Sequence, residues 1–406
     1  MEQFRQILEK PFVKELQAFG GQIYFVGGAV RDYIRGVEPN DIDLVVRNID
    51  PVLLKEILFK FGLIDLVGQS FGVFIFAERG TGFKCEIALP RRDSKVEDAV
   101  DRKTAIEVQS DPSLDIQDDL LRRDFTCNSI AIDQELKVID PFNGLRDIAK
   151  KFVVPTSVET FMDDPLRLIR AVRFAAQLDF RLHEGCLMDI TWNSHLIRKV
   201  SPERILQEFE KVVAKESNVW TFLTHMCNHT QMYQQAFGIK PNNEFTLEDT
   251  LHVKTVPEML YLTLRGENPP INRWGDHFKI KMKLSSDQVK ELNSFEWLNT
   301  AKNDNVTSHD NRMTIFKVMK YTPQLFDSHF MTLPGVDRHE FEIGRYPKTM
   351  ADLDVTSDEL MKKLGLEPGK AFGELKNALV YAVMQDRVEN TKSKLIRFAK
   401  TVYVKE

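Results

Sequence analysis

Two aspartates one residue apart, Asp41 and Asp43, have the spacing that brings two carboxylates to one face of a strand. Side chains at i and i+2 project to the same side, so Ile42 and Leu44 would face the core. Neighbouring carboxylates repel unless a cation neutralises them, and Mg²⁺ shared with substrate phosphates is the natural candidate. Two such ions about 4 Å apart would activate an attacking hydroxyl and stabilise a departing pyrophosphate. For an isolated pair, a solvated strand edge is the alternative.

A double glycine lies upstream, where Gly27 and Gly28 separate a predicted buried strand from a predicted short helix. Glycine lets the backbone approach a ligand closely, and the N–H groups that begin a helix favour an anion such as phosphate. Arg31, on the first turn, would add a charge-assisted contact to the same phosphates. A tight turn with a surface arginine is the alternative. Coupled to the aspartate pair, the motif favours a site for nucleotide phosphates and metal.

GGAVRD followed by DID resembles the signature of the polymerase-β-like nucleotidyltransferases. More narrowly, it resembles that of the class II tRNA CCA-adding enzymes and bacterial poly(A) polymerases. Four later elements follow in that group's order: RRDFTINA at residues 121–130, with Cys127 and Ser129 as departures; D-P-x-x-G-x-x-D at 140–147; E-D-x-x-R at 163–167, with Asp163 for the glutamate; and S-x-E-R-I at 201–205. Near the C-terminus, LGLEPGKAFGELKNAL resembles the tail of bacterial members.

The resemblance assigns roles to three residues of the second element. Arg123 would contact phosphate. Asp124 would accept a hydrogen bond from the ribose 2′-hydroxyl and so distinguish NTP from dNTP, and Asn128 would lie near the same ribose. The alternative for all three is a charged helix N-terminus with ordinary caps.

Asp164 and Arg167 are predicted to share one face of a helix, because residues at i and i+3 are neighbours there. The carboxylate accepts hydrogen bonds and the guanidinium donates them. Cytosine and adenine both offer an amino donor beside a ring-nitrogen acceptor, whereas uracil and guanine offer the opposite order. One Asp/Arg pair would therefore bind C and A and reject U and G. Arg170 and Arg173 extend the row, and an amphipathic helix with a solvated basic face is the alternative.

Glu86 lies on a predicted strand, either as a third carboxylate near the metals or as an ordinary surface side chain. Arg91, Arg92 and Lys95 follow in the region where the resembling family has a mobile loop. They are candidates for handling phosphate or RNA, although most such runs are solvated.

Two further groups of residues are weaker candidates. His225 and His229 have the i, i+4 spacing of a metal site, but a structural or surface role is favoured because no acidic ligand is near in sequence. Basic residues of the C-terminal segment would contact an RNA backbone, with a soluble helix surface as the alternative. These residues are Lys376, Arg387, Lys392, Lys394, Arg397 and Lys400.

The pattern along the chain predicts an α+β fold with an α/β head and a helical remainder. QIYFVGG, DIDLVV, GVFIFA and FKCEIAL predict strands, and AVRDYIRG predicts a short helix. Later segments such as FMDDPLRLIRAVRFAAQL, SPERILQEFEKVVAK, VWTFLTHMCNH and SDQVKELNSFEWL predict helices. With the resemblance, this implies a polymerase-β-like nucleotidyltransferase head at 1–145 with a small mixed sheet. An all-α neck at 146–215, a body at 216–330 and a tRNA-binding tail at 331–406 would follow.

Net charge, apolar runs and cysteine spacing exclude several classes of protein. The net charge of −5 argues against a surface that binds polyanions everywhere, but leaves room for local basic strips. No run approaches the ~20 apolar residues of a membrane span. Charges stand where a signal peptide would have its apolar core, so we expect a cytoplasmic protein. The four scattered cysteines indicate neither a disulfide framework nor a thiolate zinc site, and no obligate protein partner is evident.

The resemblance implies CCA addition to the tRNA 3′ end from CTP and ATP, with Mg²⁺ as cofactor and the tail on the tRNA elbow. Residues 67–74 resemble the CCA-adding side of the family, and the long basic extension suited to poly(A) tailing is missing. We expect no phosphohydrolase activity, because the segment VPEMLYLTLRGENPPINRW after the neck has no His-Asp pair, and His309-Asp310 lies in a polar, loop-like stretch. The alternatives are a CC-adding or A-adding enzyme, a poly(A) polymerase, or an inactive tRNA-binding protein.

Overall fold

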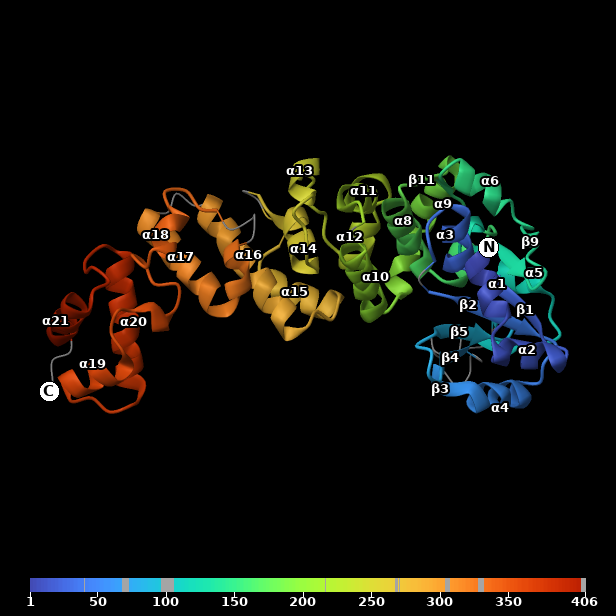
Figure 1. Cartoon of the computed structure of the whole chain (residues 1–406). Helices are drawn as coiled ribbons and strands as arrows, with labels where there is room; N and C mark the ends of the chain where they lie inside the picture. Colours follow the sequence, from blue (N-terminus) through green and yellow to red (C-terminus); the bar gives the residue numbers. More distant parts are fainter. Residues whose placement is uncertain are drawn as a thin grey trace. The chain divides into compact units, whose positions relative to one another are not determined.

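The structure is a computed structural model that describes residues 1–39, 41–67, 73–95, 106–215, 217–266, 269, 271–303, 307–327 and 332–402. The chain forms two compact units (Figure 1). Unit 1 comprises Met1–Val200 and Thr221–Met232, and unit 2 comprises Ser201–Trp220 and Tyr233–Glu406. The predicted division into head, neck, body and tail is finer than this and stays a prediction.

Unit 1 is built on a seven-stranded mixed sheet with the order β3-β4-β5-β2-β1-β8-β9. Its strands are β1 (Gln22–Val26), β2 (Asp43–Arg47), β3 (Gly62–Val67), β4 (Val73–Glu78), β5 (Lys84–Ala88), β8 (Ala131–Asp133) and β9 (Val138–Ile139). Only the β2–β5 pair is parallel, and β2 is the middle strand. Two small sheets pair β6 (Arg91–Lys95) with β7 (Ile106–Ser110), and β10 (Phe152–Val153) with β11 (Arg181–Leu182).

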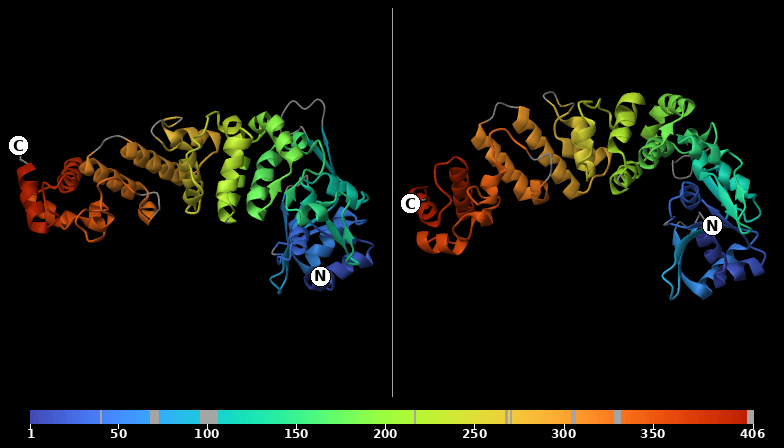
Figure 2. Two further views of the ribbon diagram at one scale, coloured as in Figure 1. Left: turned by 90° about the horizontal axis from the view of Figure 1, so that it is seen from above. Right: turned by 45° about the horizontal axis from the view of Figure 1, so that its top comes forward.

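Helices connect the strands of unit 1 and continue beyond them. They are α1 (Glu2–Leu8), α2 (Pro11–Ala18), α3 (Gly28–Ile34), α4 (Pro51–Phe61), α5 (Ile116–Leu121), α6 (Gly144–Ala149), α7 (Thr160–Asp163), α8 (Leu166–Leu178), α9 (Glu184–Asn193) and α11 (Val219–Thr224), with short 3₁₀ turns η1 (Thr126–Asn128) and η2 (Ser194–Lys199) and a π turn η3 (His225–His229). All the strands lie in the first half of the chain, coloured blue to green in Figure 2.

The described residues of unit 2 form helices joined by loops and contain no strand. Its helices are α10 (Pro202–Ala214), α12 (Met232–Phe237), α13 (Leu247–Thr250), α14 (Val256–Leu264), α15 (Trp274–Lys281), α16 (Ser286–Asn303), α17 (Ser308–Tyr321), α18 (Arg338–Glu342), α19 (Ser357–Leu364), α20 (Lys370–Met384) and α21 (Lys392–Val402), with 3₁₀ turns η4 (Pro323–Asp327) and η5 (Met350–Asp352). Several begin at a threonine cap, as Thr255 and Thr356 do, whose hydroxyl accepts the hydrogen bond of a first-turn N–H. The expected α+β architecture with a helical remainder is confirmed.

Two local predictions are wrong in detail. Alternating faces were expected along DIDLVV, yet Leu44, Val45 and Val46 are all buried, because β2 is the middle strand of its sheet. The single helix expected from residue 161 to 178 is two helices, α7 and α8. Pro165 separates them, since proline disfavours helical backbone at the residue before it.

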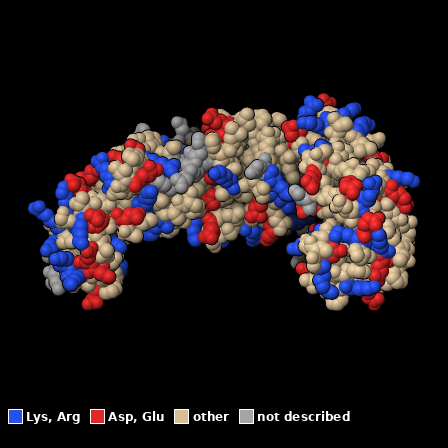
Figure 3. Space-filling model, viewed as in Figure 1, with Lys and Arg blue, Asp and Glu red and all other residues tan. Residues whose placement is uncertain are grey.

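The surface carries both signs of charge. On the face drawn in Figure 3, Lys and Arg side chains are interspersed with Asp and Glu side chains in both units. Within the described residues, no helix combines the length and the apolar composition needed to cross a bilayer. The segment 67–74 that favoured CCA addition lies partly outside the described residues, at 68–72.

Candidate active site

Three carboxylates converge at one end of β2. Asp43 is the first residue of this strand, and the parallel register places Glu86 of β5 directly beside it. Burial raises the pKa of Asp43 to about 6, and repulsion from Glu86 and Asp41 adds to the rise, while Arg123 opposes it. Glu86, which the sequence left open, therefore lies near enough to Asp43 for its charge to act on that carboxylate, and its role as a third metal ligand stays a prediction.

Asp41 occupies a different position from the one expected. It lies in a bend before β2 rather than on the strand, and its side chain is exposed, whereas Ile42 is buried as predicted. In the described part of the chain, no three His, Cys, Asp or Glu side chains already form a metal-holding group. This fits a Mg²⁺ site of the kind that needs only one or two carboxylates and takes further ligands from substrate phosphates.

Gly27 forms the wall next to these carboxylates. Its backbone has φ +70° and ψ −137°, which side-chain-bearing residues rarely adopt. A Cβ built on Gly27 would lie 3.0 Å from Oδ2 of Asp43 and 3.1 Å from a guanidinium nitrogen of Arg123. Because Gly27 has no side chain, the turn can pass between the carboxylate of Asp43 and the guanidinium of Arg123.

Asp119 holds Arg123 in this place, and the sequence analysis did not single it out. Its carboxylate is fully buried and accepts hydrogen bonds from Arg122 at 2.6 Å and from Arg123 at 3.0 Å. Burial alone would raise the pKa of Asp119, but the two arginines lower it below the ordinary value. The available signal was the spacing of Asp119, on α5, from Arg122 and Arg123 at i+3 and i+4, just past the end of that helix.

A second network joins α3, η1 and α8 through buried side chains. Arg31 donates to Oδ1 of Asn128 at 2.7 Å and to the carboxylate of Asp32. The Asn128 amide in turn donates to Asp124 at 2.9 Å, and Arg170 of α8 donates to the other carboxylate oxygen of Asp124 at 2.9 and 2.5 Å. Four predicted site residues, Arg31, Asn128, Asp124 and Arg170, are therefore brought together.

Asp124 has its acceptor capacity filled within this network. Four donors reach its two oxygens: the backbone N–H of Phe125, the Asn128 amide, and Nε and one Nη of Arg170. A carboxylate offers about four lone-pair sites, so a ribose hydroxyl would have to displace one of these donors. Burial alone would raise the pKa of Asp124, but Arg170 and Asn128 lower it. Its predicted role toward the 2′-hydroxyl stays a prediction.

Asp164 and Arg167 do not share a helix, contrary to the prediction. Asp164 follows the last residue of α7 and has extended backbone. Its carboxylate accepts a hydrogen bond from the N–H of Leu166 at the start of α8. Arg167, on the first turn of α8, donates to the backbone carbonyls of Thr160 and Arg122. The proline between them imposes this break. Recognition of the base by the pair stays a prediction, now with Asp164 on the loop before α8.

Arg173 extends the row on α8, as expected, but its side chain is buried. It contacts the ring of Phe174 at 4.1 Å and donates to Gln177. Leu168, Ala171, Val172 and Ala175 are buried and form the apolar flank of α8. The alternative of a solvated basic face is therefore wrong for Arg173.

The other candidates lie elsewhere or remain open. Arg91, Arg92 and Lys95 are on β6, and their proposed phosphate or RNA contacts stay a prediction. His225 and His229 form a π turn with their Nδ1 atoms 3.1 Å apart, and burial and His229 lower the pKa of His225 to about 4.

In the C-terminal segment, Lys392 and Lys394 form ion pairs with Glu359 and Glu389. Lys392, Lys394, Arg397 and Lys400 lie on α21. Their contact with RNA stays a prediction.

The chain is similar to known proteins in sequence and in fold. Residues 23–154 match the family described as Poly A polymerase head domain, and residues 179–229 match a probable RNA and SrmB-binding site of polymerase A. The chain is 27% identical to a CCA-adding enzyme of Ligilactobacillus salivarius over 98% of its own length and 96% of that enzyme.

Two solved structures share the fold over nearly the whole chain. The Bacillus stearothermophilus CCA-adding enzyme in complex with CTP superimposes with a TM-score of 0.64 at 21% identity, covering 96% of this chain and 95% of that one. The Thermotoga maritima CCA-adding enzyme complexed with tRNA gives 0.63 at 18% identity, covering 99% and 98%. With its carboxylates, arginines and motif order, the chain is similar to CCA-adding enzymes along nearly its whole length, and its residues 23–154 carry the poly(A) polymerase head domain.

Proposed function

We propose that this protein is a tRNA nucleotidyltransferase that adds C, C and A from CTP and ATP to the tRNA 3′ end and releases pyrophosphate. The observation that carries the proposal is the convergence of Asp43, Glu86 and Asp41 beside Arg123. Relatives of nearly the same length named CCA-adding enzyme support the choice of substrate. The same proposal places the protein in the cytoplasm, where tRNA and both nucleotides are found.

The carboxylates are suited to hold Mg²⁺. The raised pKa of Asp43 records burial and the repulsion of Glu86 and Asp41, and a cation between these groups would relieve that repulsion. Asp41 and Asp43 would be its protein ligands, with Glu86 as a third. When bound, divalent ions favour ionisation of the attacking hydroxyl and offset charge on the triphosphate.

The surrounding residues would hold the nucleotide. Arg123, kept in place by Asp119, faces the carboxylates across Gly27 and is placed to contact phosphate. Gly27, Gly28 and Arg31 would border the same phosphates. Asp124, Asn128 and Arg170 would lie at the ribose, and Asp164 and Arg167 at the base, with Arg173 supporting the helix from inside.

We extend the proposal to the organisation of the chain. Residues 1–145 would form the catalytic head, 146–215 the neck, 216–330 the body and 331–406 the tail that contacts the tRNA elbow. The complex of the Thermotoga maritima enzyme with tRNA supports RNA as the partner.

The test is incorporation of CTP and ATP into a tRNA transcript that lacks CCA, with Mg²⁺, resolved to single nucleotides. We expect growth by three residues that then stops. Asp41→Asn and Asp43→Asn should lose at least about 100-fold of the rate, because each removes charge that a metal needs. Both should still bind tRNA. Asp65→Asn, an exposed carboxylate on β3, is the matched control.

Other products would redirect the proposal. Two residues with CTP and no later A would indicate a CC-adding enzyme, and one A on a primer that already ends in CC, without C addition, would indicate an A-adding enzyme. A long ladder from ATP alone would indicate a poly(A) polymerase. Binding of tRNA without any incorporation would indicate an inactive RNA-binding protein.

A further inference from the structure

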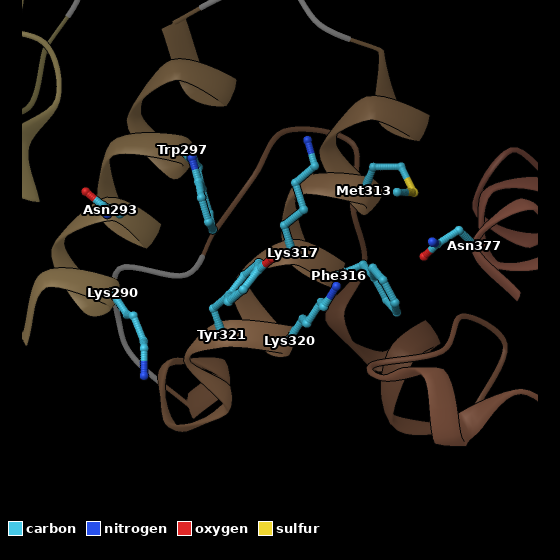
Figure 4. Close-up of a pocket in the computed structure, with 9 residues that line it drawn as sticks. All are labelled: Lys290, Asn293, Trp297, Met313, Phe316, Lys317, Lys320, Tyr321 and Asn377. Carbon is cyan, nitrogen blue, oxygen red and sulfur yellow. The ribbon is translucent and has the colours of Figure 1, made fainter. Parts of the chain in front are cut away.

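Unit 2 contains a cavity far along the chain from the catalytic residues. It measures about 560 Å³ and lies between α16, α17 and α20 (Figure 4). Its lining residues are Lys290, Asn293, Trp297, Met313, Phe316, Lys317, Lys320, Tyr321 and Asn377. Pockets for small ligands measure roughly 300–1,000 Å³, so this one has the size for a single nucleotide.

Two aromatic rings border the cavity from different helices. Trp297 projects from α16 and Tyr321 from the end of α17, with their ring centroids 5.7 Å apart (Figure 4). Trp297 is 36% exposed and Tyr321 48% exposed, although both belong to residue types that usually bury most of their surface. The two ring planes are inclined by 58°, so a flat ligand can stack on one ring while its edge contacts the other.

The charge of the lining is of one sign. Lys290, Lys317 and Lys320 contribute three ammonium groups, and none of the lining residues is acidic. Lys290 is paired with Asp287 at 2.8 Å. Within the part of the chain that the structure describes, Lys317 and Lys320 have no carboxylate partner, unlike Lys392 and Lys394 of α21. Two unneutralised ammonium groups beside exposed rings favour an anion attached to an aromatic group.

We propose that this cavity binds one unpaired nucleotide of an RNA strand. Its base would stack on Trp297 with its edge toward the inclined ring of Tyr321, and Lys317 and Lys320 would contact the adjoining phosphates. Proteins that read single-stranded RNA combine aromatic stacking with basic side chains in this way. A paired base has both faces covered by its neighbours, so the site selects a base turned out of a helix or loop. The inference rests on the proposed function, which supplies an RNA partner.

Filter binding of a tRNA transcript lacking CCA to the full-length protein tests the site. Trp297→Ala should raise Kd by about 5- to 100-fold, the range found when one stacked base loses its aromatic partner. Trp297→Phe should restore most of the affinity, since it keeps a ring. Lys317→Gln with Lys320→Gln should raise Kd and flatten its dependence on salt, because each phosphate contact adds roughly 0.7–0.9 to that slope.

Matched controls come from an exposed helix of unit 1. Phe59→Ala and Lys55→Gln on α4 remove an exposed ring and an exposed ammonium group, and both should leave Kd unchanged. Thermal unfolding of every variant identifies loss of fold. The Lys317→Gln, Lys320→Gln variant should stay folded, because both side chains are exposed. Wild-type affinity in both the Trp297→Ala and the lysine variants would overturn the site.

A free mononucleotide offers the same base and phosphate as a nucleotide of RNA, so a separate experiment distinguishes the two ligands. Fluorescent AMP is titrated into the Asp41→Asn, Asp43→Asn protein, with and without Trp297→Ala. Saturable binding that requires Trp297, with tRNA affinity unchanged by Trp297→Ala, would overturn an RNA source in favour of a mononucleotide. Failure of the proposed function is separate, because it would appear as no CTP or ATP incorporation by the wild-type protein.

Discussion

At the scale of single residues, Gly27 makes the sharpest prediction. Gly27→Ala would force an unfavourable backbone and push a methyl group against Asp43 and Arg123. We expect about 1–3 kcal/mol lower stability and at least about 100-fold lower incorporation of CTP. Gly36→Ala is the control, because Gly36 also has positive φ, at +77°, but a Cβ there meets nothing within 4 Å. Equal losses of activity in the two variants would show that strain, and not crowding of the site, is responsible.

Asp119 makes a second prediction at this scale. Asp119→Asn would leave Arg122 and Arg123 without their shared negative charge in a largely buried place. We expect a stability loss of about 2–4 kcal/mol and a fall in kcat/KM for CTP, because Arg123 would no longer be fixed beside the carboxylates. Steady-state incorporation and urea unfolding measure the two effects. Unchanged kcat/KM in a destabilised protein would reduce Asp119 to a purely structural role.

At the scale of elements, Glu291 of α16, outside the catalytic site, is expected to make the stability of the folded state depend on pH. It accepts the hydroxyl of Thr255, the cap of α14, at 2.6 Å. Burial raises its pKa from 4.5 to about 7, and Glu258 adds to the rise while the Thr255 hydrogen bond opposes it. The folded state holds this proton more tightly than the unfolded chain, so stability falls as pH rises from about 4.5 to about 7 and then levels.

Glu291→Gln should therefore stabilise unit 2 above pH 7, by up to about 3 kcal/mol. The gain should shrink as pH falls toward 4.5 and vanish below it, where the wild-type side chain is protonated in both states. Thermal unfolding at pH 5 and pH 8 measures it. Glu367→Gln, an exposed carboxylate before α20, should show no such pH-dependent gain. A gain of the same size at both pH values would contradict the assignment to Glu291.

Elements also show where sequence reasoning succeeds and where it stops. The strands β1, β4 and β5 and the helix α10 follow from local apolar patterns, which depend only on neighbouring residues. The register of β2 with β5 does not, because it joins residues 43 positions apart through backbone hydrogen bonds. Glu86 consequently stayed open until the pairing placed it beside Asp43. Asp164 was misplaced because helical spacing was counted across Pro165.

At the scale of the whole molecule, every residue proposed to catalyse the reaction or to bind the CTP or ATP substrate lies in unit 1, whereas unit 2 has its own buried residues. Sequence motifs indicated that the candidate catalytic and substrate-binding residues lie in the first half of the chain. They did not indicate the cavity of unit 2, because its lysines and rings come from two helices, α16 and α17, and form no local motif.

This division predicts a selective response to nucleotide. CTP at about 100 times its Kd should stabilise the unit that binds it by about 2.7 kcal/mol. Calorimetry should thus show an upward shift of one unfolding transition, which Asp43→Asn reduces, while the transition of unit 2 stays in place. Glu291→Gln identifies the latter transition at pH 8. An equal shift of both would show that the units unfold together.

The parallel pairing of β2 with β5 also limits how the length of this chain can vary. A slip of one residue along β5 would turn Glu86 into the core and bring Cys85 or Ile87, both buried now, to the side of Asp43. Insertions and deletions are therefore tolerable only where the slip can be absorbed. The turn between β4 and β5 is such a place, since Gly80 and Gly82 have open space around them. Variants of this protein can therefore lengthen or shorten that turn while β2 and β5 keep their register.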